Sequence, residues 1–151
     1  MKVAVIRFSS IGDIVLTTPV VRLLKSQVEA EVHYVTKKQY GSIVFNNPYV
    51  DKVHVLDKSL EALVSQLRAE KFDYLIDLHH NLRTRLLSLR TGIPTLRFNK
   101  LNIEKWLLVN FKMNRLPNVH IVDRYLETIK SLGVKGDALG LDYFIPEADY
   151  V

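Results

Sequence analysis

The chain has 151 residues, of which 48% are hydrophobic and 25% are charged, and its formal net charge at pH 7 is +5. This length suits one domain with an ordinary hydrophobic core, so we expect no second complete domain. Cysteine is absent, which excludes disulfides and thiolate metal sites and favours a reducing, cytoplasmic setting. The N-terminal apolar run ends after four residues, too few for a signal-peptide core or a membrane span.

Short apolar runs alternate with helical patterns along the chain. The patterns predict strands at residues 3–8, 31–36, 52–56, 72–78 and 94–98, and helical segments at 13–28, 37–46, 59–71, 82–89, 103–111 and 122–132. Thr18 is expected to cap a segment that starts at Pro19, or Pro19 kinks one continuous helix. In the predicted strand at residues 31–36, Val32 and Tyr34 alternate with polar residues. Gly133 is the expected C-terminal cap of the last predicted helix. This order predicts an α/β fold with a doubly wound, mostly parallel sheet and helices on both faces.

The C-terminal end differs from the rest of the sequence. We expect residues 1–140 to form the domain and residues 141–151 to begin a connector, because no further element follows to receive them. No internal repeat or low-complexity run occurs before residue 133.

The loop after the first predicted strand contains Ser9, Ser10, Gly12 and Asp13. Ligands of open α/β sheets bind beyond the carboxyl ends of the strands, and hydroxyls and a glycine let an oxyanion or a sugar approach the backbone. Asp13 is either a helix N-cap or a base that takes a proton from a substrate hydroxyl. One glycine is too few for a dinucleotide fingerprint, and neither a phosphate-binding P-loop nor a nucleophile elbow occurs.

A second polar segment, residues 77–84, follows another predicted strand and should lie on the same rim. His79, Asn81 and Arg83 can reach the cleft from there. The adjacent histidines 79 and 80 lack a third ligand at metal spacing, so we expect no metal site. Arg83 is either an ordinary surface residue or a residue whose planar guanidinium binds a carboxylate or phosphate of a substrate.

Residues 78–116 contain eight basic side chains and one acidic side chain, Glu104. This local charge is typical either of a solvated face or of a surface that meets an anionic partner. A nucleic-acid module is an alternative from a different class, but no nucleic-acid motif or stacking platform accompanies the charge. The segment around Trp106 is either core or a membrane-surface helix. Asp123 and Arg124, adjacent on a helix, favour a structural role.

Four motifs together resemble the lipopolysaccharide heptosyltransferase family, glycosyltransferase family 9. They are IRFSSIGDIVLTTP at residues 6–19, NPYVDKV at 47–53, DLHHNLRT at 77–84 and HIVDRY at 120–125. The first is the most specific, because its order of hydroxyls, Gly-Asp, apolar residues and Thr-Pro is unusual. The resemblance spans nearly the whole chain.

The resemblance implies one Rossmann-like half of a two-domain GT-B enzyme, which transfers heptose from ADP-heptose to the inner core of lipopolysaccharide at the cytoplasmic face of the inner membrane. The alternative within the same class is a glycosyltransferase that uses another sugar nucleotide. It implies that Asp13 is the general base and that Ser9, Ser10, Gly12, His79, Asn81 and Arg83 contact the anionic acceptor. It also implies that a C-terminal domain, absent from these residues, binds the sugar nucleotide, so this chain alone should be inactive. We expect no cofactor, no metal and no nucleic-acid partner, and possible partners include the membrane surface.

Overall fold

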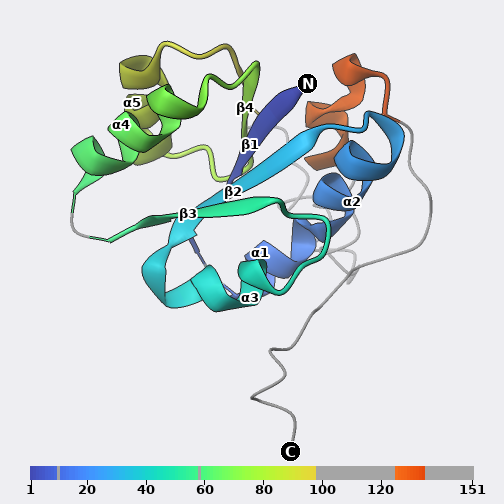
Figure 1. The fold of residues 1–151 in the computed structure, drawn as a ribbon, viewed down its shortest axis with the longest axis horizontal. Helices are drawn as coiled ribbons and strands as arrows, with labels where there is room; N and C mark the ends of the chain where they lie inside the picture. Colours follow the sequence, from blue (N-terminus) through green and yellow to red (C-terminus); the bar gives the residue numbers. More distant parts are fainter. Residues whose placement is uncertain (10, 58, 98–124, 135–151) are drawn as a thin grey trace, which may run out of the picture.

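The computed structural model describes residues 1–9, 11–57, 59–97 and 125–134, and these residues form a layered α/β structure around one parallel sheet (Figure 1). The strands, in chain order, are β1 (Lys2–Ile6), β2 (Glu31–Lys37), β3 (Lys52–Leu56), β4 (Tyr74–Asp77) and β5 (Thr95–Arg97). Their order across the sheet is β3-β2-β1-β4-β5, and every neighbouring pair is parallel. The central strand β1 pairs with β2 on one side and with β4 on the other, so that Val3 lies opposite both Val32 and Tyr74.

Helices cover both faces of the sheet. They are α1 (Ile11–Leu16), α2 (Thr18–Gln27), η1 (Lys38–Tyr40), α3 (Gly41–Phe45), α4 (Leu60–Glu70), α5 (Leu82–Thr91) and η2 (Lys130–Leu132), the last preceded by helical residues 125–128. Val3 and Val5 of β1 pack into a core with α1, α2, α3 and residues 125–134, whereas Ala4 and Ile6 pack into a second core with α4 and α5. The predicted doubly wound fold is therefore confirmed.

Local signals account for where the two helices of the second core begin and end. Ser59 accepts a hydrogen bond from the backbone N–H of Ala62, and Asn81 forms a reciprocal capping box with Thr84. Lys71 ends α4 and Gly92 ends α5, both with a left-handed backbone. Glycine adopts that conformation without strain, so residue 92 suits a helix end. Gly133 is likewise left-handed at φ +85°, as predicted for a cap.

The two predicted helical pieces after β1 are separated one residue earlier than expected. Thr17 occupies the N-cap position of α2 without a side-chain capping bond, and Thr18 is already helical, so Thr18 is not the cap. The Thr17 hydroxyl instead donates to the carbonyl of Ile14 at 2.6 Å and lies 2.7 Å from the buried hydroxyl of Tyr34. Burial raises the pKa of Tyr34, which keeps this hydroxyl protonated. Pro19 fits in the first turn, where its missing N–H costs nothing.

The burial of β2 does not follow the predicted alternation. His33 and Thr36 are 2% and 0% exposed, as buried as the apolar residues between them. The reason is that β2 is an inner strand, covered by helices on both faces. The predicted helix at 37–46 is divided into η1 and α3.

Some predictions fall on residues outside the described ranges. These include the helix at 103–111, the first residues of the helix at 122–132, residue 98 of the fifth predicted strand and the connector at 141–151. Among the described helices, none has the length and apolar character needed to cross a bilayer.

Candidate functional site

The candidate site lies at the carboxyl ends of β1 and β4. These strands are neighbours, but the chain continues from β1 toward β2 on one side and from β4 toward β5 on the other. Loops that leave adjacent strands in opposite directions open a crevice, the usual ligand position in doubly wound sheets. The two polar segments found in the sequence, residues 9–13 and 77–84, follow these two strands and therefore meet here.

Arg7, the first residue after β1, connects the two loops. Its Nε donates to the carbonyl of Ser9 at 2.7 Å, and its Nη1 donates to the carbonyl of Leu78 at 3.2 Å. Its Nη2 lies 3.1 Å from Oδ2 of Asp13. The planar guanidinium thus ties the first loop, the second loop and α1 together through one rigid group.

Asp13 is the third residue of α1, so it is inside the helix and not at its N-cap position. The N-cap interpretation is therefore wrong: the helix begins two residues earlier, and a carboxylate in its first turn also interacts favourably with the helix dipole. The side chain of Asp13 is 38% exposed, whereas that of its partner Arg7 is 15% exposed. A carboxylate that is oriented by a half-buried cation yet open to solvent can accept a proton from a bound hydroxyl.

Gly12 and Ser9 lie on either side of the start of α1. A side chain added at Gly12 would meet no atom within 4 Å, so the space next to this backbone is open. Ser9 is partly exposed, and its carbonyl accepts from Arg7. Ser10, the other predicted acceptor contact in this loop, lies outside the described residues.

Asp77, the last residue of β4, organises the second loop although its side chain is 0% exposed. Its Oδ1 accepts from the backbone N–H groups of His79 at 3.1 Å and His80 at 2.8 Å, and its Oδ2 accepts from Nε of Arg97 at 3.3 Å. His80 has a positive φ of 49°, a conformation that these bonds help to hold. The buried carboxylate therefore fixes the backbone of the loop through these hydrogen bonds and does not face the crevice.

The predicted residues of the second loop differ in what they do. The ring of His79 packs beside Phe8, with centroids 5.6 Å apart, and is partly exposed. The side-chain oxygen of Asn81 accepts from the N–H of Thr84 at 2.9 Å, so it caps α5. Among the described residues, neither His79 nor His80 belongs to a group of three potential metal ligands.

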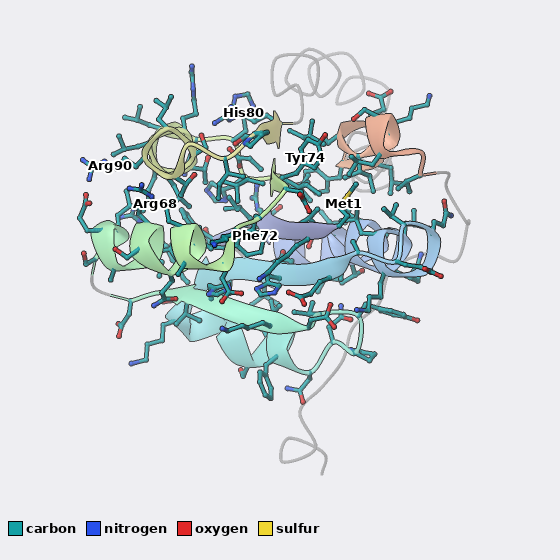
Figure 2. The ribbon with its side chains drawn as sticks, turned by 45° about the horizontal axis from the view of Figure 1, so that its top comes forward. Met1, Arg68, Phe72, Tyr74, His80 and Arg90 are labelled. Carbon is teal, nitrogen blue, oxygen red and sulfur yellow. The ribbon has the colours of Figure 1, made fainter. Side chains whose placement is uncertain are left out.

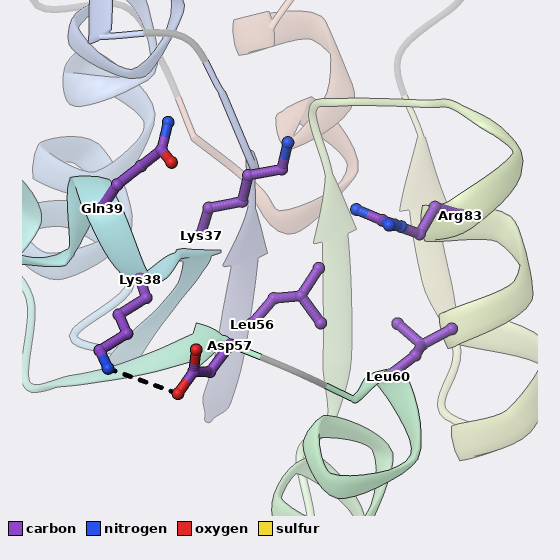
Figure 3. A pocket seen from close by; sticks show the side chains of 7 residues that line it. All are labelled: Lys37, Lys38, Gln39, Leu56, Asp57, Leu60 and Arg83. Carbon is purple, nitrogen blue, oxygen red and sulfur yellow. Dashed lines mark hydrogen bonds and ion pairs between the residues drawn. The ribbon is translucent and has the colours of Figure 1, made fainter.

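Arg83, at the start of α5, lines a cavity of about 590 Å³ on the same rim. Figure 3 shows Lys37 at the end of β2 and Arg83 directed into this space from opposite sides, while Lys38 pairs with Asp57 at 3.4 Å. Two cations that face one space favour a ligand with carboxylate or phosphate groups. The lining residues are Lys37, Lys38, Gln39, Leu56, Asp57, Leu60 and Arg83.

The sequence patterns missed three of these roles. Arg7 and Asp77 are charged residues within apolar runs, close to the ends of strands. A charge at such a position is a signal that could have predicted their roles at the rim. Lys37 has no local signal, because its neighbour across the cavity is Arg83, far away in the chain. His120, Asp123, Arg124, Trp106 and the basic residues from Lys100 to Arg115 lie outside the described residues.

Comparisons of the sequence and the fold with known proteins show which proteins this chain resembles. No family model matches the chain. It is 28% identical over 136 residues to lipopolysaccharide heptosyltransferase 1 of Campylobacter coli, and the match covers 83% of this chain but 40% of that protein.

Solved structures show the same fold. A family 9 glycosyltransferase from Veillonella parvula superposes with a TM-score of 0.76 at 23% identity, covering 97% of this chain and 46% of that one. The E. coli heptosyltransferase WaaC with ADP gives a TM-score of 0.69 at 19% identity, covering 94% and 50%. The chain thus spans about half the length of the proteins it matches. It is similar to the lipopolysaccharide heptosyltransferases in sequence and has the fold of half of a family 9 glycosyltransferase, which confirms the resemblance that its motifs indicate.

Proposed function

We propose that this chain is the acceptor-side domain of an inverting heptosyltransferase that builds the inner core of lipopolysaccharide. The observation that carries the proposal is the Arg7–Asp13 pair, which stands partly exposed at the crevice between β1 and β4. The similarity to the Campylobacter coli heptosyltransferase supports the reaction class. An E. coli WaaC structure contains ADP-2-deoxy-2-fluoro heptose, which supports ADP-heptose as the donor class.

In this proposal Asp13 is the general base. An acceptor hydroxyl loses its proton to the Asp13 carboxylate as its oxygen bonds to the anomeric carbon of the donor sugar, and the bond from that carbon to ADP breaks on the opposite side. ADP leaves with the electron pair, so the configuration at the anomeric carbon inverts. Arg7 orients the carboxylate through its three contacts to Ser9, Leu78 and Asp13. The step requires no cofactor, and the sugar nucleotide is a substrate.

The acceptor is an anionic core saccharide in this proposal. Lys37 and Arg83 would hold its carboxylate or phosphate groups in the cavity of about 590 Å³. The open backbone at Gly12 and the partly exposed side chains of Ser9 and His79 would contact its hydroxyls. The donor half lies outside these residues, so the chain alone should be inactive, and a peripheral contact with the inner membrane stays a prediction.

The test is heptose transfer from ADP-heptose to a heptose-free lipopolysaccharide, measured with this chain joined to a donor-binding half. Replacing Asp13→Asn should lower the transfer rate about a hundredfold to ten-thousandfold, because the base is lost while the shape is kept. The matched control is Glu29→Gln, an exposed acid between α2 and β2. Transfer by Asp13→Asn at the wild-type rate would remove the base from the proposal, and transfer only from other sugar nucleotides would replace the donor.

A second test concerns the cavity. Arg83→Ala should weaken binding of the anionic acceptor about tenfold, which corresponds to about 1.4 kcal/mol, and the loss should shrink as salt rises. Arg85→Ala removes an exposed arginine from the same helix, outside the cavity, and should change binding little. Equal losses in both variants would indicate a diffuse charge effect and contradict a specific anion contact.

A further inference from the structure

A buried cluster of polar side chains lies at the opposite end of the sheet from the proposed active site. His33 on β2 and His54 on β3 are 2% and 4% exposed, and Glu70 ends α4 with a side chain that is 20% exposed. One ligand atom from each of the three residues lies within 4.8 Å of the others. Phe72, labelled in Figure 2, covers the cluster, with its ring edge-on to both imidazoles at centroid distances of 4.9 and 6.2 Å.

The outer nitrogens of the two imidazoles each face an oxygen that accepts a hydrogen bond. Nε2 of His33 lies 2.7 Å from Oε2 of Glu31, and Nδ1 of His54 lies 3.4 Å from Oε1 of Gln66. Both contacts form when these outer nitrogens carry the protons and the oxygens accept.

In this tautomer, the inner nitrogens of the two imidazoles carry lone pairs that face one another. Nδ1 of His33 lies 2.9 Å from Nε2 of His54 and 3.3 Å from Oε2 of Glu70. In that tautomer, three acceptor atoms from β2, β3 and α4 converge on one point, an arrangement that a bound cation would stabilise.

We propose that Nδ1 of His33, Nε2 of His54 and Oε2 of Glu70 bind one divalent transition-metal ion of the Zn²⁺ type. Two imidazoles and a carboxylate are a common zinc donor set. Tetrahedral zinc with bonds of about 2.0 Å to nitrogen holds its ligand atoms about 3.3 Å apart. The distances of 2.9 and 3.3 Å are within a few tenths of an ångström of that spacing.

The surrounding contacts match the support that metal ligands usually have. Histidines that bind a metal normally donate their other N–H to a carboxylate or carbonyl, as His33 does to Glu31 and His54 does to Gln66. These partners set the tautomer in which the inner nitrogen is free to bind the ion. The site joins β2, β3 and α4, so a bound ion would stabilise the fold at this edge.

Two lysines at the border of the cluster form ion pairs with Glu70, and a bound metal ion would have to displace one of them. Nζ of Lys52 lies 3.2 Å from Oε1 of Glu70, and Nζ of Lys2 lies 3.2 Å from Oε2, the proposed ligand atom. Lys52 can keep its oxygen when a metal binds, whereas Lys2 must move to its second partner, Glu31, now 3.5 Å away. The side chain of Lys2 is 30% exposed, so it has room to move.

The experiment titrates the chelator-treated chain with Zn²⁺ by calorimetry and with Co²⁺ by visible absorption. We expect saturable binding of one ion per chain, the absorption of tetrahedral Co²⁺ and a higher melting temperature with Zn²⁺. His54→Phe keeps a ring of similar size, and Glu70→Gln keeps the shape of the carboxylate. Each should weaken Zn²⁺ binding at least tenfold and remove the Co²⁺ signal. The supporting variant Glu31→Gln should weaken binding about tenfold to a hundredfold.

His80→Gln is the matched control, because it removes a histidine at the other end of the sheet and should leave binding unchanged. Circular dichroism shows whether each variant is folded, and Glu31 is exposed enough that its variant tests the site without disturbing the core. Absence of saturable binding in the wild type would overturn the proposal. So would equal binding in folded His54→Phe and Glu70→Gln, or a loss in His80→Gln as large as theirs. None of these measurements depends on transferase activity.

Discussion

The two ends of the sheet both hold acidic side chains next to cations, but they use them differently. At the carboxyl ends of β1 and β4, Asp13 is paired with Arg7 and is still 38% exposed. At the opposite end, both oxygens of Asp51 accept from Lys25, at 2.8 and 2.7 Å, and one also accepts from the backbone of Val32. Both oxygens of Asp51 therefore hold α2 to β2 although its side chain is 34% exposed, whereas the ion pair of Asp13 with Arg7 lies beside a crevice.

The difference follows from the path of the chain. At the carboxyl end, β1 and β4 send their loops to opposite sides, which leaves a crevice between them. At the amino end, side chains from neighbouring strands contact one another, as His33 of β2 and His54 of β3 do at 2.9 Å. At the carboxyl end, a partly exposed ion pair therefore lies beside a crevice, next to the buried Asp77, whereas at the amino end Asp51 and His33 make contacts that join neighbouring elements. Four changes of single residues test this contrast.

The largest expected effect is on stability and comes from Asp77→Ala. The change leaves the N–H groups of His79 and His80 and the guanidinium of Arg97 without their buried acceptor, which should cost about 3 kcal/mol. Urea unfolding measures the loss. A cost below about 1 kcal/mol would show that water replaces the carboxylate and that Asp77 does not shape the loop.

Next is Arg7→Met, which keeps the length of the side chain but removes all three contacts of the guanidinium. We expect kcat of the assembled transferase to fall about a hundredfold, because Asp13 loses its orientation, with a smaller change in KM. Arg7→Lys should restore only part of the rate, since an ammonium cannot reproduce the planar fork. Wild-type kcat in Arg7→Met would mean that Asp13 is positioned without its partner.

A smaller effect is expected from Asp51→Asn at the opposite end of the sheet. Burial raises the pKa of Asp51, but the ion pair with Lys25 and the N–H of Val32 outweigh it and hold the pKa below its ordinary value of 3.8. The folded state therefore binds the proton less readily than the unfolded state, so this stability is complete above pH 3.8 and is lost as pH falls below it. The variant should be about 1 kcal/mol less stable at pH 7 and no less stable than the wild type under strongly acidic conditions. Urea unfolding at several pH values measures this difference, and a pH-independent cost would contradict the ionic origin.

The smallest change in stability is expected from Gly12→Ala. The new methyl group meets no atom within 4 Å, and alanine is the better helix former, so stability should stay equal or rise by up to about 1 kcal/mol. If the acceptor occupies this open space, the KM for the acceptor should rise several-fold at the same time. Thermal melts and acceptor titrations separate the two effects, and an unchanged KM would remove Gly12 from the acceptor site.

The sequence by itself determined the parts of this protein that depend on local chemistry. Apolar periodicity indicated the order of strands and helices, Ser59 marked the start of a helix, and Gly133 marked an end. Because parallel strands place their carboxyl ends on one rim, the sequence also predicted that residues 9–13 and 77–84 lie on the same rim. Asp13 was predicted at this rim at the start of a helix, as an N-cap or a base, whereas it is the third residue of α1.

Only the tertiary structure decided which side chains meet. Arg7 reaches the carbonyl of Leu78, 71 residues further along the chain, and His33 meets His54 across two neighbouring strands. Periodicity assigned His33 to a polar face, because it cannot show that both faces of an inner strand are covered. Short-range patterns report the preference of each segment, whereas pairing between distant segments depends on how the sheet is ordered and on which strands end up inside it.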